Sequence, residues 1–387
     1  MANHGTTGDD AVESATKQPV SRRRFLSHTG LAGASALGLA AVDARATTVD
    51  DTVEIVVVEH LGEALVTKEV PQGWYQAVQR SRTVRDVLVD RYQNEAWLGS
   101  IGRSAGSASI GGMAVPTITA YARDVATAER KLPSQIDGVT IDIAEHEDPV
   151  LNHETPGEQS HCSHLDWCNN NNYSCVPGGA YVVPQLNDGS KSCHSGTCIV
   201  THNGAHRYMT CAHGFLDSCS DDISGNRLEQ GSSKQYVGTV TAYSAAQDWA
   251  VVSEAWNSQI GGFNNTIIGR SQRVRGHVTQ DGVDTLVSNS QTIYKYGART
   301  CRTSGVVDEE RQYTYCNWSE PFVLSTNNVE GGDSGSPHYI FYEDGGTWYL
   351  AIVGLLHGST STHAWCPAAY KISGDHGIGF GASTTTC

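Results

Sequence analysis

The sequence of 387 residues has little of what several large protein classes require. Only 17% of its residues are charged, which excludes a coiled coil or a helical-repeat array. No apolar run reaches the roughly 20 residues of a membrane-spanning helix. Basic residues are also few: 26 Lys and Arg stand against 41 Asp and Glu, for a formal charge of −15. Nucleic acid is therefore not expected as a partner, because phosphate binding needs a basic face.

The first 46 residues have the order of parts found in an export signal. The sequence SRRRFL at 21–26 has the twin-arginine form S-R-R-x-F-L, and a weakly apolar stretch follows at 30–42. Ala44-Arg45-Ala46 then offers small residues for cleavage. The alternative is a basic N-terminal tail. We expect a signal peptide over 1–46, and hence a secreted protein that engages the export machinery and has no stable membrane span.

Cysteine is absent from the first 161 residues, and all 11 cysteines follow from Cys162 onward. Clustered cysteines in an exported domain predict disulfides, and the odd count leaves at least one thiol outside intrachain pairs. A zinc site is the alternative for a group near the start of this region: His161, Cys162, His164, Cys168 and Cys175. Its C-x5-C-x6-C spacing matches no zinc pattern, so no metal site is predicted.

The chain divides at about residue 160. Residues 47–160 carry a predicted strand at 53–59, a helix with one apolar face within 74–98, and a second strand near 131–144. This is a small α+β module, which we interpret as a propeptide or folding aid; a permanent accessory domain is the alternative. The polar residues of 147–165 predict a linker, and so a region for processing.

Residues 161–387 have the pattern of a mainly β domain. Asn203-Gly204 predicts a hairpin, because both residues tolerate positive φ. No convincing helix separates the short apolar runs, which indicates an antiparallel sandwich or barrel. The runs lie at 181–183, 197–202, 207–210, 237–243, 249–252, 322–324, 340–342 and 349–356.

Three segments of this region carry residues suited to chemistry. The sequence GGDSGSP at 331–337 places a serine between glycines, which let backbone N–H groups converge on a developing oxyanion. The sequence TCAHG at 210–214 places a histidine just after a predicted strand, and QDWAVV at 247–252 places an acid just before one. A glycine-rich turn, an ordinary histidine and a strand cap are the alternatives. The joint occurrence of His, Asp and Ser in that order favours a catalytic triad.

The region from about Cys198 to Ile372 resembles the chymotrypsin/trypsin-like serine peptidase family, in the compact form of the streptogrisin-like enzymes. TCAH at 210–213 is similar to that family's T-A-A-H, and DWAVV at 248–252 to its D-[IY]-[AG]-[LI]-V. GDSGSP at 332–337 is similar to G-D-S-G-G-P, with Ser336 replacing the second glycine. Segments 296–305, 353–358 and 367–372 resemble the start of the second barrel, the pocket strand and the closing strand.

The resemblance implies a fold and a set of roles. It implies two packed antiparallel six-stranded β-barrels, preceded by the α+β module, with a peptidase domain over 161–387. Ser334 would attack the peptide carbonyl, His213 would act as the base and Asp248 would orient it. The N–H groups of Gly332 and Ser334 would form the oxyanion hole, and no metal or organic cofactor is required. The function expected is that of a serine endopeptidase acting on polypeptides; the alternatives are a non-catalytic secreted binding protein and an esterase.

The resemblance also places a specificity pocket. Asn328, six residues before the nucleophile, would lie on its floor and offers no charge to Lys or Arg. Leu356 and His357 would lie near its wall, where the family usually has serine at the place of His357. A histidine nearby is a feature of glutamate-specific relatives, although its position here is shifted by one. A preference for glutamate is the resulting hypothesis.

Two further expectations concern the partners of buried groups. The family pairs the acid equivalent to Asp333 with a freed N-terminal amine or an arginine, so Arg299 or Arg302 is expected here. The family also implies a disulfide from Cys198, here to Cys219 or Cys211. Spacing alone pairs Cys301 with Cys316 and Cys366 with Cys387.

Overall fold

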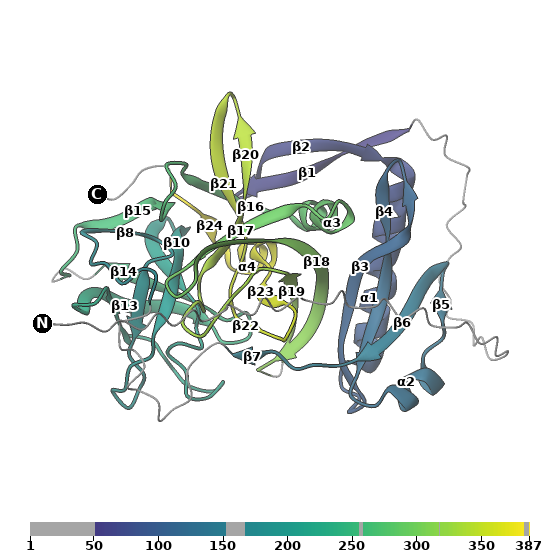
Figure 1. Cartoon of the computed structure of the whole chain (residues 1–387), viewed down its shortest axis with the longest axis horizontal. Helices are drawn as coiled ribbons and strands as arrows, with labels where there is room; N and C mark the ends of the chain where they lie inside the picture. The colour runs from purple at the N-terminus through teal and green to yellow at the C-terminus, as the bar shows by residue number, and fades with distance from the viewer. Residues whose placement is uncertain (1–50, 152–166, 255–257, 317, 383–386) are drawn as a thin grey trace, which may run out of the picture. The chain divides into compact units, whose positions relative to one another are not determined.

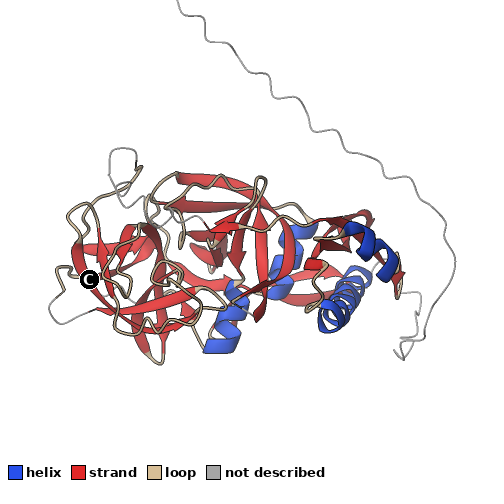
Figure 2. Ribbon diagram, turned by 90° about the horizontal axis from the view of Figure 1, so that it is seen from below, coloured by secondary structure: helices blue, strands red, loops and turns tan. Residues whose placement is uncertain are grey.

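The computed structural model describes residues 51–151, 167–254, 258–316, 318–382 and 387. The predicted signal peptide and the boundary near residue 160 lie outside these residues. The described residues all belong to one compact unit. Strands dominate the described part, and helices are few (Figure 2). Among the described residues, none of the helices combines the length and the apolar character needed to cross a bilayer.

The N-terminal elements form the expected mixture of strands and helices. The apolar face of the long helix α1, which includes Trp74, Val84 and Leu88, is buried, and α1 lies along β3 and β4 (Figure 1). The elements are β1 (Thr52–His60), β2 (Glu63–Pro71), α1 (Gln72–Tyr92), β3 (Leu98–Ile110), β4 (Met113–Ala122), α2 (Val125–Lys131), β5 (Gln135–Ile136), β6 (Val139–Glu145) and β7 (Val150–Leu151).

The remaining elements are mostly short strands. In the first half they are β8 (Cys175–Gly178), β9 (Tyr181–Pro184), β10 (His194–His202), β11 (Ala205–Thr210), β12 (Arg227–Gln230), β13 (Gln235–Ser244), β14 (Trp249–Glu254) and β15 (Gly262–Ile267). In the second half they are β16 (Val274–Val278), α3 (Gln280–Ser288), β17 (Thr292–Gly297), β18 (Cys301–Tyr315), β19 (Trp318–Ser325), β20 (Pro337–Asp344), β21 (Thr347–Leu355), β22 (Gly358–Ser359), β23 (Ala364–Pro367), α4 (Ala369–His376) and β24 (Gly379–Phe380).

Strands β9 to β14 form a closed antiparallel ring. Their order is β11-β14-β13-β12-β9-β10, and a further pairing of β10 with β11 completes the cycle. The turn at Asn203-Gly204 joins these last two strands, as predicted, with φ of +51° at Asn203. Buried apolar side chains that include Val182, Ile199 and Tyr208 fill one core of this half. A short parallel pair of β8 and β15 packs beside it.

The second half pairs as an open path. The order β16-β21-β20-β17-β18-β19-β23-β22 runs through it, β21 meets the end of β23 only in an isolated bridge between Gly354 and Ala368, and N-terminal strands extend the same sheet. β1 pairs antiparallel with β16, with Val58 opposite Val278, and β3 pairs antiparallel with β18, with Ile101 opposite Gln312. The expectation of a mainly β fold is confirmed, whereas the second predicted barrel is part of a larger sheet.

Two helices in the second half correct the sequence analysis, which expected none there. Helix α3 begins at an N-cap, Thr279, whose side chain accepts a hydrogen bond from the Gly282 N–H. Its buried Val283, Leu286 and Val287 have helical spacing, so the signal was present but short. Segment 367–372, expected as a closing strand, instead leaves β23 at Pro367 and enters α4.

The N-terminal module shares buried contacts with the second half. Arg103, 1% exposed, lies 2.8 Å from Asp284 and also pairs with the fully buried Glu310. Arg85 approaches Glu310 within 2.7 Å. Trp74 donates its indole N–H to Ser288 Oγ at 3.2 Å. Removing one member of such a buried ionic cluster leaves an uncompensated charge, so the two parts depend on each other for stability.

Candidate active site

Two adjacent strands bring His213 and Asp248 together. His213 follows the end of β11, Asp248 immediately precedes β14, and the two strands pair antiparallel with Thr210 opposite Ala250. Asp248 has a φ of +48°, a left-handed conformation that Asp adopts more readily than most residues. Its Oδ1 accepts from the His213 N–H at 2.7 Å, and its Oδ2 lies 2.7 Å from His213 Nδ1. The carboxylate therefore fixes both the backbone and the ring of the histidine.

A second imidazole reaches the same carboxylate. Nδ1 of His357 lies 2.6 Å from Asp248 Oδ2, and the side chains of both residues are buried. The His357 ring packs against Tyr315 and Phe322, with ring centroids 4.5 Å and 5.3 Å away. Sequence analysis expected His357 near a pocket wall; the structure shows that its Nδ1 contacts Asp248.

Burial and charge act against each other in this group. Burial disfavours the ionised form of Asp248, but the charges and hydrogen bonds of His213 and His357 outweigh it and hold the pKa of Asp248 well below its ordinary value. For His213, burial lowers the pKa, yet the attraction of Asp248 raises it well above the ordinary imidazole value. Burial dominates at His357 and lowers its pKa. Burial thus favours the neutral form of His357, whereas Asp248 favours the protonated form of His213.

Ser334 lies on a tight loop between β19 and β20. Gly332 and Gly335 have φ of +97° and +81°, which glycine adopts without strain. A Cβ at Gly335 would lie 2.3 Å from the Ser195 carbonyl oxygen and 2.6 Å from Thr210 Oγ1. The loop thus packs directly against the strand end that leads to His213, and only glycine fits there.

Hydrogen bonds hold this loop on both sides. The Ser195 N–H donates to the Ser334 carbonyl at 2.8 Å, and Ser195 Oγ donates to the Gly332 carbonyl at 3.0 Å. On the other side, the Gly335 N–H donates at 2.7 Å to the carbonyl of Leu356, the residue before His357. The structure therefore brings the loop of Ser334 next to the segments that carry the His213–Asp248 pair.

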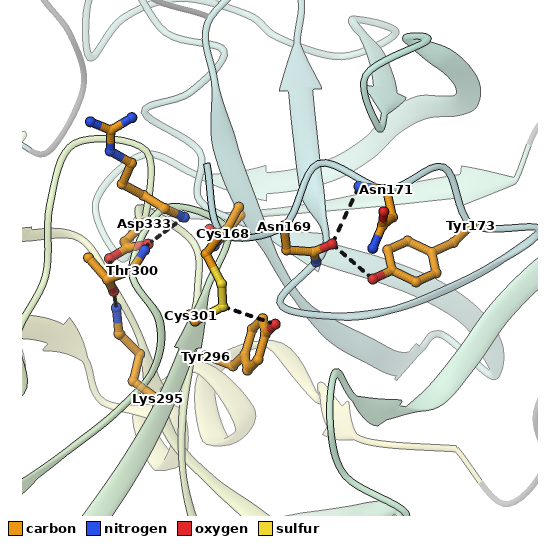
Figure 3. Close-up of a disulfide and its surroundings, with 12 residues drawn as sticks. Cys168, Asn169, Asn171, Tyr173, Lys295, Tyr296, Thr300, Cys301 and Asp333 are labelled. Atoms are coloured by element: carbon orange, nitrogen blue, oxygen red, sulfur yellow. Dashed lines mark hydrogen bonds and ion pairs between the residues drawn. A yellow bond between two sulfur atoms is a disulfide. The ribbon is translucent and has the colours of Figure 1, made fainter. Parts of the chain in front are cut away.

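Asp333 is held from within the chain. It is fully buried, and its Oδ2 lies 2.6 Å from Lys295 Nζ and accepts from Thr300 Oγ1 at 2.6 Å. Figure 3 shows Lys295 pointing toward these two residues, close to the Cys168–Cys301 disulfide. Burial lowers the pKa of Lys295, although the attraction of Asp333 opposes this.

The predicted arginine partner of Asp333 was therefore wrong. Arg299 contributes only its backbone N–H, 3.0 Å from Asp333 Oδ1, while its side chain contacts Glu330. Arg302 does not fill the role either. Lys295 was missed because no motif marks it: it lies on β17, 38 positions before the acid, and only the pairing of β17 with β20 brings it close.

The other predicted residues lie around this centre. Among the described residues, no hydrogen bond uses the Gly332 N–H, the expected oxyanion donor. Leu356 is buried beside Ala364 and Cys366. Asn328 is exposed, and its carbonyl accepts from Thr303 Oγ1 at 3.1 Å.

Sequence analysis missed a buried pair, Cys366 and His338, of which Cys366 packs against Leu356. Cys366 Sγ is 2.8 Å from His338 Nδ1, and burial lowers the pKa of His338 to about 3. His338 directly follows the serine motif, but nothing in the pattern distinguished it from an ordinary strand residue.

Three disulfides join described cysteines, and they differ from the expected pairs. They are Cys168–Cys301, Cys175–Cys387 and Cys219–Cys316. Cys198, Cys211 and Cys366 are free thiols and buried, so the pairs expected from Cys198, Cys301 and Cys366 were wrong. Spacing failed because each disulfide connects elements that are far apart in sequence, at least 97 positions. Disulfides are typical of an oxidising, extracytoplasmic compartment.

No protein-family model and no curated protein matches the chain. Solved structures to which it is similar include serine proteases. Thermobifida fusca Protease A is 17% identical, with a TM-score of 0.38, and the match covers 53% of this chain and 97% of that one. A glutamic-acid-specific serine protease, described as using a histidine triad in substrate binding, is 22% identical (TM-score 0.38; 53% and 100% covered). Cellulomonas bogoriensis chymotrypsin is 18% identical (TM-score 0.37; 54% and 99% covered).

Proposed function

We propose that the chain is an exported serine endopeptidase that cleaves peptide bonds through an acyl-enzyme intermediate. The observation that carries this is the double contact of His213 with Asp248, through its N–H and its Nδ1, each at 2.7 Å. The serine loop packs against the same strand end at Gly335. An acid that fixes an imidazole beside a glycine-bounded serine is the arrangement required to activate a hydroxyl.

The proposed reaction proceeds in two halves. Ser334 Oγ attacks the peptide carbonyl while His213 Nε2 takes the hydroxyl proton and passes it to the leaving amine, which departs as the peptide C–N bond breaks. Water then attacks the acyl-enzyme, gives its proton to His213 and releases the carboxyl product with Ser334 restored. Asp248 keeps the Nδ1–H tautomer and stabilises the imidazolium. The N–H groups of Gly332 and Ser334 stabilise the oxyanion. Removing one such donor typically raises the activation barrier by about 2.7–4 kcal/mol.

In this proposal Lys295 holds the serine loop in place by pairing with Asp333. In the family, a freed N-terminal amine or an arginine pairs with the acid before the nucleophile, whereas Asp333 already has an internal ammonium partner at 2.6 Å. The loop therefore needs no amine created by cleavage. We propose that the chymotrypsin-like arrangement of two barrels underlies the site, with the closed ring of β9–β14 as the first.

The proposed domains are a twin-arginine signal peptide at 1–46, a propeptide at 47–160 and the peptidase at 161–387. Sheet pairing of β1 and β3 with the second half supports a folding role for residues 47–160, since these strands complete its edges. The disulfides support export.

The experiment is hydrolysis of a peptide library and of ester substrates by the full chain and by Ser334→Ala. Cleavage of peptides that is lost in Ser334→Ala supports the endopeptidase. Cleavage of esters alone favours the esterase. A folded protein that cleaves neither is the non-catalytic binding protein.

A further inference from the structure

A buried group of soft metal ligands lies directly beside the proposed base. Cys211 stands two residues before His213, and its Sγ is 3.7 Å from Nδ1 of His194. One ligand atom from each of His194, Cys211 and His213 lies within 4.8 Å of the others, and all three residues are buried.

A glycine next to His213 leaves room for the His194 ring to approach. Gly214 follows His213, and a Cβ there would lie 3.0 Å from His194 Cδ2 and 3.1 Å from His194 Nε2. Any larger residue at this position would push the His194 ring away. The rings of His194 and His213 lie 5.2 Å apart between centroids.

We propose that His194, Cys211 and His213 form a binding site for Zn²⁺ that inhibits the enzyme. Zinc binds imidazole nitrogen at about 2.0–2.1 Å and thiolate sulfur at about 2.3 Å, which sets tetrahedral ligand atoms roughly 3.3–3.7 Å apart. The His194–Cys211 separation of 3.7 Å already meets this. One thiolate and two imidazoles suit zinc better than calcium or magnesium, which prefer oxygen. The fourth position would take water, and on binding the thiol proton, together with the proton of His213 where that ring is protonated, passes to solvent.

Binding would stop the proposed reaction because both nitrogens of the His213 ring are in use. Nδ1 lies on Asp248 at 2.7 Å, and Nε2 is the atom that exchanges the serine proton. Ligation through either one removes the base. The inhibition thus rests on the proposed function, whereas the metal site itself does not.

A second group of donors, His213, Asp248 and His357, also lies within 4.8 Å. Its atoms already bond to one another, at 2.7 Å and 2.6 Å, so a metal there would have to break the pair that organises the site. The cysteine-containing group is therefore the one that we assign.

The test is titration of the full chain with Co²⁺, a spectroscopic substitute for Zn²⁺, in the Ser334→Ala background. We expect a thiolate-to-cobalt charge-transfer band with tetrahedral d–d bands that saturates at one equivalent and is displaced by Zn²⁺. Cys211→Ala and His194→Gln, each checked for cooperative thermal unfolding, should lose the band. Cys198→Ala, which removes another buried free thiol, should keep it. Absence of the band, or its persistence in Cys211→Ala, overturns the site.

A kinetic arm separates the site from the proposed function. Zn²⁺ should inhibit peptide hydrolysis by the active chain, and Cys211→Ala should need at least 10-fold more Zn²⁺ for half-inhibition of its own uninhibited rate. Equal sensitivity of the two proteins contradicts inhibition through this site. If the chain hydrolyses nothing, the proposed function fails while the cobalt result still decides the metal site.

Discussion

His357 contacts the carboxylate of Asp248, which also contacts the proposed base, His213. Asp248 Oδ2 lies 2.6 Å from His357 Nδ1 and 2.7 Å from His213 Nδ1, so one oxygen serves two imidazoles. The resemblance places a serine where His357 stands. An imidazole there competes with the proposed base, His213, for the same carboxylate oxygen.

The first prediction concerns pH. Because the attraction of Asp248 raises the His213 pKa above its ordinary value of about 6.5, the base loses its proton at a higher pH than a free imidazole does. We expect kcat/KM to increase with pH through a midpoint above 6.5. His357→Ala should concentrate the Asp248 charge on His213 and move this midpoint further upward, with kcat/KM at neutral pH falling about 10- to 100-fold.

Two variants control this experiment. His357→Ser supplies a hydroxyl that can donate to Asp248, so it should restore part of the lost rate and move the midpoint back. His363→Ser removes a histidine that pairs with Asp308 at 2.9 Å, and it should leave the profile unchanged. A midpoint in His357→Ala at or below that of the unmodified chain would show that His357 does not share the acid's charge.

The sequence offered candidate residues more readily than it offered the architecture around them. His213, Asp248 and Ser334 could be proposed because each lies in a short motif beside a strand, where residue type and spacing carry the signal. Lys295 and the Cys219–Cys316 disulfide were not found, because their partners lie 38 and 97 positions away. Helix α3 was missed because its nine residues are too few for a clear period. The pairing of β3 with β18 joins segments on either side of the predicted domain boundary, and no local pattern encodes it.

The second prediction concerns Lys295. Lys295→Met would leave the buried Asp333 carboxylate without its ammonium partner, which typically costs about 3–5 kcal/mol. We expect a lower free energy of unfolding in denaturant titration and loss of most peptidase activity. Lys295→Met combined with Asp333→Asn should recover part of the stability, because the orphaned charge is gone. Single and double variants that are equally unstable would contradict this pairing.

The third prediction concerns the fit of Gly335. A Cβ in Gly335→Ala would meet the Ser195 carbonyl at 2.3 Å, and overpacking typically costs about 1–3 kcal/mol. The positive φ adds about 1–2 kcal/mol. We expect lower thermal stability and a strongly reduced kcat. Gly374→Ala is the matched control, since it lies in α4 with open space around it and should be neutral or slightly stabilising. Equal effects of the two substitutions would refute the close packing of the loop.

The fourth prediction concerns the Cys219–Cys316 disulfide. It joins the loop after His213 to the tip of the β18–β19 hairpin, next to Tyr315, whose ring contacts His357 at 4.5 Å. Cys219→Ser combined with Cys316→Ser should reduce stability by about 2–4 kcal/mol and lower kcat/KM. Replacing both cysteines of Cys175–Cys387 in the same way should reduce stability with a smaller loss of kcat/KM. A larger kinetic loss in the second pair would contradict a role for the hairpin at the site.

The fifth prediction concerns the N-terminal module. Arg103→Met would leave Asp284 and Glu310 with less compensation in the buried cluster, at a cost of about 3–5 kcal/mol. If residues 47–160 assist folding, the variant should give less soluble protein from refolding, and residues 161–387 alone should refold poorly unless 47–160 are added separately. Equal refolding yields for residues 161–387 with and without the module would exclude a folding role.

The most direct test of the proposed enzyme is covalent labelling by a fluorophosphonate, in low and high salt, of the full chain before and after cleavage in the 147–165 linker, beside Ser334→Ala. This probe reacts with a serine only when a base and an oxyanion site activate it. The account predicts one label per chain, placed on Ser334 by peptide mapping, and none in Ser334→Ala. A folded, linker-cleaved protein that takes no label in either salt would contradict the account and favour the non-catalytic binding protein.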